Sequence, residues 1–236
     1  MTTHQEESQP RGGFETALHH LTQEILDGNV GAGTRLPGER ELSEKLGVSR
    51  GAVREAMKVL QTQGIVTSQV GPGRGTRVAS TQGPAFGRIL RLHVALHAIS
   101  FDELTDTRVL LERAATLSAA TTMEDHTLDT LDKLCEDMEA VSDIDPFNEL
   151  DTAFHVEIAR AGNNRLVRDL TVAIREAVAG HILSAEHSVV GWDELRLSLV
   201  REHRGIVAAL RLGDGELAAA LAERHVRGAH AALLPH

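Results

Sequence analysis

The chain has 236 residues, which is long enough for two domains with separate cores. No apolar run approaches the ~20 residues of a membrane span, and the single cysteine, Cys135, excludes an internal disulfide, so we expect a cytoplasmic protein with no membrane partner. The formal charge is −10, but residues 1–79 carry nine basic and nine acidic side chains, so the acidic excess lies in the remainder of the chain.

A helix is predicted close to the start of the chain. Residues 1–13 are polar and lack the apolar core of a signal peptide, so we expect a disordered lead-in. Apolar residues then recur at helical spacing, and Gly28 is placed to end the helix. These apolar residues are Phe14, Ala17, Leu18, Leu21 and Ile25.

Two more helices separated by a tight turn are predicted between residues 36 and 64. Pro37 is expected to start the first helix, because proline lacks a donor that the first turn does not need. Gly47 breaks this helix, and Ser49 can cap the next one. The second helix has an apolar side with Val53, Met57 and Leu60 and a basic side with Arg50, Arg54 and Lys58.

Short strands are predicted at residues 65–67 and 76–78, around a glycine-rich tip at residues 71–75. A helix, a turn, a basic helix and a hairpin, in this order, indicate a winged helix-turn-helix over residues 14–79. Its basic helix suits the major groove of double-stranded DNA, where arginine contacts guanine edges or phosphates. The alternative is a helical hairpin whose cations form only a solvated surface.

This region also resembles the winged helix of GntR-family bacterial transcription regulators. The matching residues are Leu36-Pro37-x-Glu39-Arg40-x-Leu42, Leu46-Gly47-Val48-Ser49-Arg50, Val53-Arg54-Glu55-Ala56, Leu60, Gly64 and Gly75-Thr76-x-Val78. The resemblance implies that Arg40, Arg50 and Arg54 contact DNA, and that the wing backbone near Gly71 enters the minor groove. This chain has Gly51-Ala52 where such proteins usually carry Thr, Ser or Pro.

The remainder of the chain reads as helical throughout. Residues 79–84 are small and polar with a Gly-Pro pair, and we place a linker at residues 80–86. Ser100 and Glu103 form a capping box that opens a long helix. Because no strand-like alternation follows the wing, residues 87–236 are expected to form an all-α bundle of six or seven helices. The predicted fold class is therefore mainly α, with a winged helix-turn-helix followed by a helical bundle.

Four residues of the bundle have the composition of a metal site. Asp151 and His155 are four residues apart on one helix, beside an apolar stripe. His203 and His225 each lie on an apolar stripe, 11 residues before and 11 residues after Asp214 in the turn of a predicted hairpin. Equidistant positions lie level in an antiparallel pair, so both histidines face each other. One carboxylate and three imidazoles suit Zn²⁺, Ni²⁺ or Mn²⁺, with zinc expected.

Other interpretations of the histidines stay open from spacing alone. The three histidines could be separately satisfied core residues beside a capping Asp151. His93 and His97 are also four residues apart, and His181 falls on another apolar stripe.

Arg108 is a second polar residue on an apolar stripe, between Leu104 and Leu111. A buried guanidinium needs an anionic partner, which could be an acidic residue of a neighbouring helix. Alternatively, Arg108 binds the carboxylate of a ligand through its planar pair of donors.

The bundle resembles the FCD-type ligand-binding domain of the FadR subgroup of GntR regulators. The matching runs are Arg108-x3-Glu112, Asp151-x-x-Phe154-His155, Ala161-Gly162-Asn163, Glu202-His203-Arg204-x-Ile206 with Leu210, and Arg224-His225. The resemblance implies that Asp151, His155, His203 and His225 bind a divalent metal. It also implies that a small organic acid binds beside the metal with the help of Arg108.

We therefore expect a homodimeric, ligand-responsive transcription regulator, a repressor, that binds a pseudo-palindromic operator and senses a small carboxylate. It is not expected to be an enzyme. The alternative is a metal-dependent enzyme domain fused to a DNA-binding domain, in which the metal activates water. Against this alternative, Glu157 lies only two residues from His155 and points elsewhere on its helix, so no general base is evident.

Overall fold

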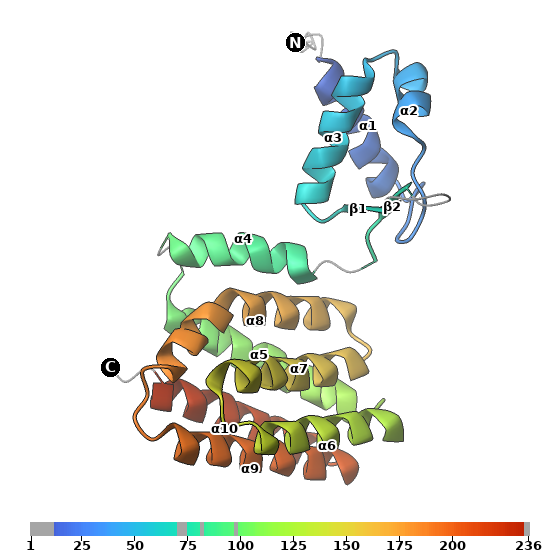
Figure 1. The fold of residues 1–236 in the computed structure, drawn as a ribbon. Helices are drawn as coiled ribbons and strands as arrows, with labels where there is room; N and C mark the ends of the chain where they lie inside the picture. The colour runs from blue at the N-terminus through green and yellow to red at the C-terminus, as the bar shows by residue number, and fades with distance from the viewer. Residues whose placement is uncertain (1–11, 70–74, 81–82, 97–98, 234–236) are drawn as a thin grey trace, which may run out of the picture. The chain divides into compact units, whose positions relative to one another are not determined.

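The structure is a computed structural model that describes residues 12–69, 75–80, 83–96 and 99–233 (Figure 1). The chain divides into two compact units, residues 1–85 and residues 86–236. Each unit has its own hydrophobic core.

The first unit is a winged helix-turn-helix. Its elements are α1 (Gly13–Leu26), α2 (Glu39–Leu46), α3 (Arg50–Thr62), β1 (Val66–Gln69) and β2 (Gly75–Val78). The strands pair antiparallel, with Val66 opposite Val78. Fully buried Ala17, Val53 and Ala56 lie at the centre of its core, where α1 and α3 pack together.

The turn between α2 and α3 forms as its residues dictate. Gly47 adopts a φ of 64°, the left-handed conformation that glycine accepts without strain. The Ser49 hydroxyl accepts a hydrogen bond from the Ala52 amide at 3.1 Å and caps α3. These two residues therefore orient α3 against α2.

Pro37 does not start α2, contrary to the sequence prediction. The helix begins at Glu39 with Gly38 as its N-cap. The preceding backbone is extended, because the Leu36 amide donates to the Thr76 carbonyl at 2.9 Å and Arg35 bridges to Arg77. Leu36 is thereby buried in the core beside the wing.

The second unit is an all-α bundle. Its helices are α4 (Gly83–Ala95), α5 (Phe101–Ala120), α6 (Asp125–Ala140), α7 (Ile144–Ala161), α8 (Arg165–Glu186), α9 (Trp192–Arg211) and α10 (Gly215–Leu233). The predicted capping box is present, since Ser100 and Glu103 each bond the other's backbone amide. The fold class predicted from the sequence is confirmed in both units.

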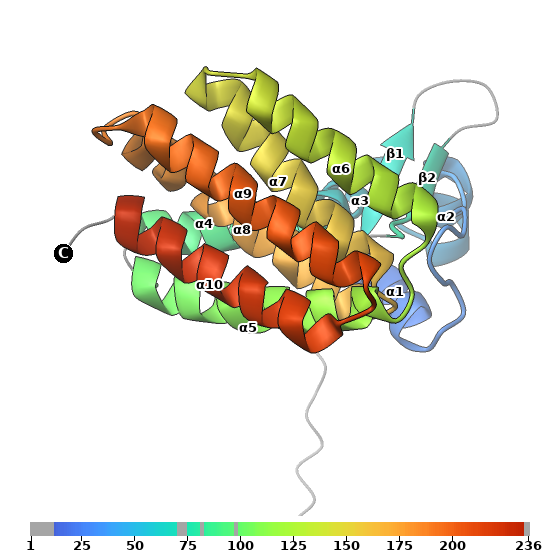
Figure 2. The same cartoon turned by 90° about the horizontal axis from the view of Figure 1, so that it is seen from below.

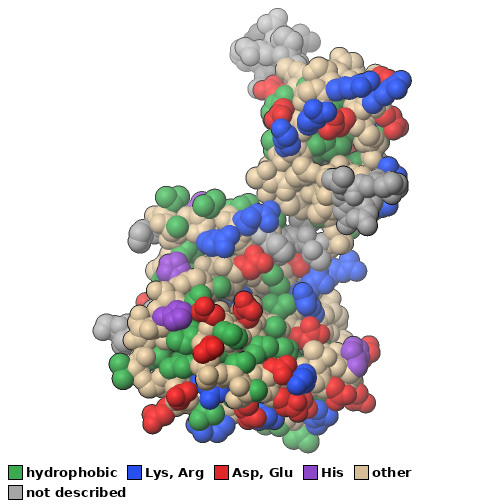
Figure 3. Space-filling view, viewed as in Figure 1, with side chains coloured by type: hydrophobic (Ala, Val, Ile, Leu, Met, Phe, Trp, Pro, Cys, Tyr) green, Lys and Arg blue, Asp and Glu red, His purple; other side chains and the backbone are tan. Residues whose placement is uncertain are grey.

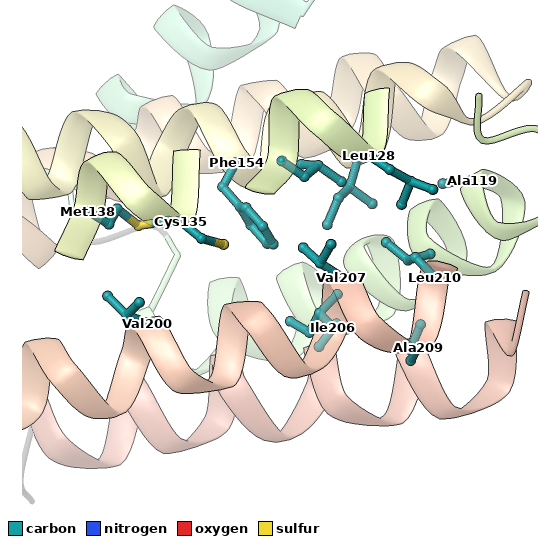
Figure 4. Close-up of a cluster of buried hydrophobic side chains, with 14 of the residues drawn as sticks. Ala119, Leu128, Cys135, Met138, Phe154, Val200, Ile206, Val207, Ala209 and Leu210 are labelled. Carbon is teal, nitrogen blue, oxygen red and sulfur yellow. The ribbon is translucent and has the colours of Figure 1, made fainter. Parts of the chain in front are cut away.

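Helices α5, α7, α8, α9 and α10 surround the middle of the bundle, and α6 covers α7 and α9 (Figure 2). The largest core cluster lies between α6, α7 and α9 and contains Phe154, Leu128 and Ile206 (Figure 4). Buried polar side chains of α5, α7, α8, α9 and α10 lie beside this apolar core. The bundle thus brings residues far apart in the sequence into one buried polar region.

Helix α4 begins at Gly83, inside the segment 80–86 that we predicted to be a linker. Pro84 is compatible with this start, because a proline in the first turn removes no helical hydrogen bond. None of the described helices is long and apolar enough to cross a membrane.

Candidate functional site

The basic side of α3 is exposed while its opposite side is buried. Arg50, Arg54 and Lys58 are all exposed, and Lys and Arg side chains gather over α2 and α3 in Figure 3. Arg54 donates to Glu39 at 2.7 Å, and Arg40 donates to Glu44 at 2.9 Å. Two of the predicted DNA contacts are thus oriented by exposed acidic partners, whereas the predicted contact Gly71 lies outside the described residues.

The four predicted metal ligands come together in the second unit. Asp151, His155, His203 and His225 offer ligand atoms that all lie within 4.8 Å of one another. The Nε2 atom of His203 is 3.2 Å from Oδ1 of Asp151 and 3.3 Å from Nε2 of His155. The Nε2 atoms of His155 and His225 lie 3.8 and 3.9 Å from the same oxygen. The histidines are buried, so the cluster has little access to water.

Two carboxylates outside the cluster orient two of its imidazoles. Nδ1 of His155 lies 2.5 Å from Oε2 of Glu112, and Nδ1 of His225 lies 2.9 Å from Oε2 of Glu202. A carboxylate at this position favours the tautomer in which Nδ1 carries the proton and donates to it, which leaves the lone pair on Nε2. Both Nε2 lone pairs therefore face Asp151, as a metal ligand requires.

The electrostatics favour neutral imidazoles beside an ionised carboxylate. Burial, together with the charge of Arg175, lowers the pKa of His155 to about 3. Burial and the neighbouring His225 lower the pKa of His203 to about 4. Burial alone would raise the pKa of Asp151, but Arg175 and His203 hold it well below its ordinary value. These are the protonation states in which such side chains bind a cation.

Arg108 is buried and points into the bundle, as its position on an apolar stripe predicted. Its Nε atom donates to Glu112 at 2.6 Å, so its acidic partner belongs to α5 itself and not to a neighbouring helix. Among the described residues, no hydrogen bond occupies its two terminal nitrogens, and Arg108 lines a cavity together with Asp151 and His225. The planar end of the guanidinium is therefore available to an anion in that cavity.

Arg175 and Glu186 were not singled out from the sequence, and Glu112 was named only as part of the run Arg108-x3-Glu112. Arg175 donates to Asp151 at 3.0 Å and lies 3.3 Å from Glu112, which links the cluster to Arg108. Glu186 also lines the cavity, and burial, with the charge of Asp151, raises its pKa to about 8. The available sequence signal was the spacing of Arg108 and Glu112, since residues four apart on a helix are neighbours.

Among the residues that the structure describes, the alternative histidines form no second cluster. His93 and His181 are exposed, and His181 lies against the ring of Phe101 at a centroid distance of 4.3 Å. His97 lies outside the described residues. His181 therefore does not face the core, contrary to its apparent position on an apolar stripe.

Family models match both units of the chain. The model for bacterial regulatory proteins of the gntR family matches residues 14–78, and the FCD domain model matches residues 103–228. The chain belongs to the GntR family, with an FCD domain. Its fold and its DNA-binding helix are therefore those of a bacterial transcription regulator.

Relatives of this GntR protein are similar over most of their length. The chain is 32% identical over 205 residues to the uncharacterised HTH-type transcriptional regulator YieP of Escherichia coli, covering 84% of this chain and 85% of that protein. It is 27% identical over 224 residues to the Glc operon transcriptional activator of Escherichia coli, covering 90% and 85%. The solved structure of Streptococcus agalactiae GntR superposes with a TM-score of 0.62 at 25% identity, covering 91% and 97%.

These family models and relatives are transcription regulators and not enzymes. The chain is a DNA-binding regulator of transcription. The alternative of a metal-dependent enzyme fused to a DNA-binding domain is not supported by them.

Proposed function

We propose that this regulator holds a divalent metal, zinc first among the candidates, through Asp151, His155, His203 and His225, with nickel or manganese as alternatives. The observation that carries the proposal is the convergence of four ligand atoms within 4.8 Å. Ligands bonded to one ion at ~2.0–2.2 Å lie roughly 3–3.5 Å apart, close to the 3.2–3.9 Å between Oδ1 of Asp151 and the Nε2 atoms of the three histidines.

Without a cation, the ligand atoms of the cluster also lack partners for their lone pairs. Nε2 of His203 lies 3.3 Å from Nε2 of His155 and 3.2 Å from Oδ1 of Asp151. Two neutral imidazole nitrogens and a carboxylate oxygen bring their lone pairs together, which is unfavourable unless a proton or a metal lies between them. A bound ion would supply positive charge for an oxyanion in the adjoining cavity.

The effector of the proposed regulator is a carboxylate that binds beside the metal ligands. Arg108, Asp151 and His225 line the same cavity, so an acid there reaches both the guanidinium and the cluster. Arginine presents two parallel donors to a carboxylate, which lysine does not. Glu112 holds Nε of Arg108 and thereby leaves the terminal nitrogens facing the ligand.

We propose that the regulator acts as a homodimeric repressor in the cytoplasm. Arg40, Arg50 and Arg54 contact DNA, together with the wing near Gly71. Binding of the effector releases the protein from a pseudo-palindromic operator. Two-fold operators match two-fold dimers. The outer side of α4 supports dimerisation, because it exposes large apolar side chains (Figure 3). These are Phe86, Ile89 and Leu92, and Leu96 directly after the helix is exposed as well. The functional division is proposed to be residues 14–79 for DNA and 87–236 for the effector.

The test combines the metal, the effector and Arg108. A thermal-shift screen of small carboxylic acids on zinc-reconstituted protein should find stabilising acids, because a ligand specific for the native state raises its stability. Calorimetry should then show that chelation and Arg108→Lys each weaken binding of the same acid. Operator affinity without acid should change little, and its response to the acid should be lost. Acid binding that is unaffected by both changes would refute the proposal.

A further inference from the structure

We infer that the effector is a monocarboxylate with an unbranched apolar body about 10 Å long, and not a short hydroxy acid or a dicarboxylate. The inference rests on the proposed function, because it assigns the class of acid to the same cavity. It is carried by the order in which polar and apolar side chains follow one another along the cavity.

Helices α5 and α10 run antiparallel beside the cavity, and their contacts establish which residues lie level. Asp102 lies 3.3 Å from His230, and Asp106 lies 3.0 Å from Arg227. Further along α5, Arg113 pairs with Glu223 at 3.0 Å. Residue numbers therefore increase along α5 in the direction in which they decrease along α10.

This register gives the cavity a polar end and an apolar end. Arg108 lies at the level of His225, whereas Phe101 lies near the level of Leu233. The ring of Phe101 contacts His181, so the neighbouring Ile182 of α8 belongs to the same apolar end. Arg108 and the metal ligands Asp151 and His225 thus lie at one end of the cavity. Aromatic and aliphatic side chains enclose the other end, together with the imidazole of His230.

The distance between the two ends sets the length of the ligand. Phe101 precedes Arg108 by seven residues, which is roughly 10 Å along a helix, or about eight carbon atoms of an extended alkyl chain. Val178 and Leu199 line the cavity and are buried. A chain that extends from the carboxylate at Arg108 towards Phe101 would therefore contact apolar side chains along its length.

The charges of the lining exclude a second carboxylate at the far end. Arg108 is the one Lys or Arg among the described residues that line the cavity, and Glu186 adds an acidic group. A second carboxylate would lose its hydration beside apolar side chains with no guanidinium to replace it, and the His230 imidazole at that end already lies 3.3 Å from Asp102. A short hydroxy acid, in turn, would leave the apolar end in contact with water.

The experiment is calorimetry on zinc-reconstituted, full-length protein with acetate, butanoate, hexanoate, octanoate and L-lactate as probes. Each buried methylene should increase affinity about three- to fourfold, so octanoate should bind about a hundredfold more tightly than butanoate. 1-Octanol and octylamine are the controls for non-specific apolar binding, and both should bind much more weakly than octanoate because Arg108 selects a carboxylate.

Variants of Ala229 and Leu233 test where the alkyl chain of octanoate lies in the cavity. Ala229 lines the cavity between its two ends, and Ala229→Phe should bring the affinity of octanoate down to that of butanoate. Ala231→Phe, on an exposed side of the same helix, is the matched control and should keep the hundredfold preference. Leu233→Asn tests the apolar end independently and should weaken octanoate about tenfold while leaving butanoate unchanged.

The outcomes separate this inference from the proposed function. If short acids bind through the metal and Arg108 but affinity is flat or falls with chain length, the effector class is wrong and the acid-sensing function stands. If no acid in the series binds, both are overturned. If both Ala229→Phe and Leu233→Asn still bind octanoate about a hundredfold more tightly than butanoate, the alkyl chain of octanoate lies elsewhere and the inference fails.

Discussion

The carboxylate of Glu112 lies between the guanidinium of Arg108 and the imidazole of His155, 2.6 Å from Nε of the first and 2.5 Å from Nδ1 of the second. One buried side chain thus orients both the proposed effector contact and a proposed metal ligand. Burial alone would raise the pKa of Glu112, but His155, Arg108 and Arg175 hold it well below its ordinary value. Glu112 is therefore ionised, accepts a hydrogen bond from Arg108, and lies within ion-pair distance of His155 and Arg175.

Glu202→Gln should weaken metal binding about 10- to 100-fold, because Glu202 fixes the tautomer and the orientation of His225. Glu202 is partly exposed, so the fold should keep most of its stability. Metal affinity measured by competition with a chelator tests this prediction. Glu157→Gln, on the helix that carries His155 but outside the cluster, is the control and should leave the affinity unchanged.

Glu112→Gln should weaken both the binding of the metal and the binding of the carboxylate effector. The amide removes a charge that is buried against two guanidinium groups, so the variant should also lose stability, by about 3–5 kcal/mol for a broken buried pair. Metal titration and acid calorimetry on the folded fraction measure the two effects. A variant that loses only one of the two would show that Glu112 does not connect them.

His203→Ala and His225→Ala should each abolish the binding of one equivalent of metal, while the bundle still folds. The apolar core between α6, α7 and α9 does not depend on these side chains. Elemental analysis after reconstitution measures the loss, and chelation should lower the melting temperature of the parent protein but not of the variants. Metal retained at one equivalent in both variants would contradict the assignment of the ligands.

The stability of the chelated protein should have a maximum near pH 6.5. Below that pH the unfolded state binds protons at His155 and His203, whereas their folded pKa values of about 3 and 4 keep them neutral, so stability falls with falling pH. Glu186, with a folded pKa of about 8, binds a proton in the folded state that the unfolded state has lost above pH ~4.5.

The unfolded state binds about one proton more at pH 5–6, which gives a slope of about 1.4 kcal/mol per pH unit. It binds roughly half a proton fewer at pH 7–8, so stability declines there about half as steeply. Urea denaturation between pH 5 and pH 8 measures both limbs. Glu186→Gln should remove the decline above pH 7 and steepen the acidic limb. A monotonic profile in the parent protein would contradict these pKa shifts.

Arg50→Ala and Arg54→Ala should weaken operator binding while leaving the fold intact, since both side chains are exposed on α3. Loss of a base contact should cost about 1–3 kcal/mol and relax specificity, whereas loss of a phosphate contact should weaken all sequences alike. Electrophoretic shift on a mapped operator and on random DNA separates the two. Unchanged affinity in both variants would refute docking through α3.

The sequence by itself determined the winged helix-turn-helix, because its signals are local. Gly47 and Ser49 form the turn that their chemistry requires, and Val53 and Met57 bury the predicted side of α3. It also determined that Arg108, His155, His203 and His225 turn inward, although it placed His181 wrongly on an inward face. The convergence of His203 and His225 followed from their equal distance from the turn, and their rings lie 4.3 Å apart.

Only the tertiary structure decided which charged groups meet inside the bundle. Leu36 and Thr76 hold the chain extended before α2, so Pro37 could not start the helix as its local preference suggested. Arg175 reaches Asp151 and Glu112 across three helices, and no spacing in one helix encodes such a contact. A buried charge is stable only with partners from neighbouring elements, and those partners exist only once the helices have packed.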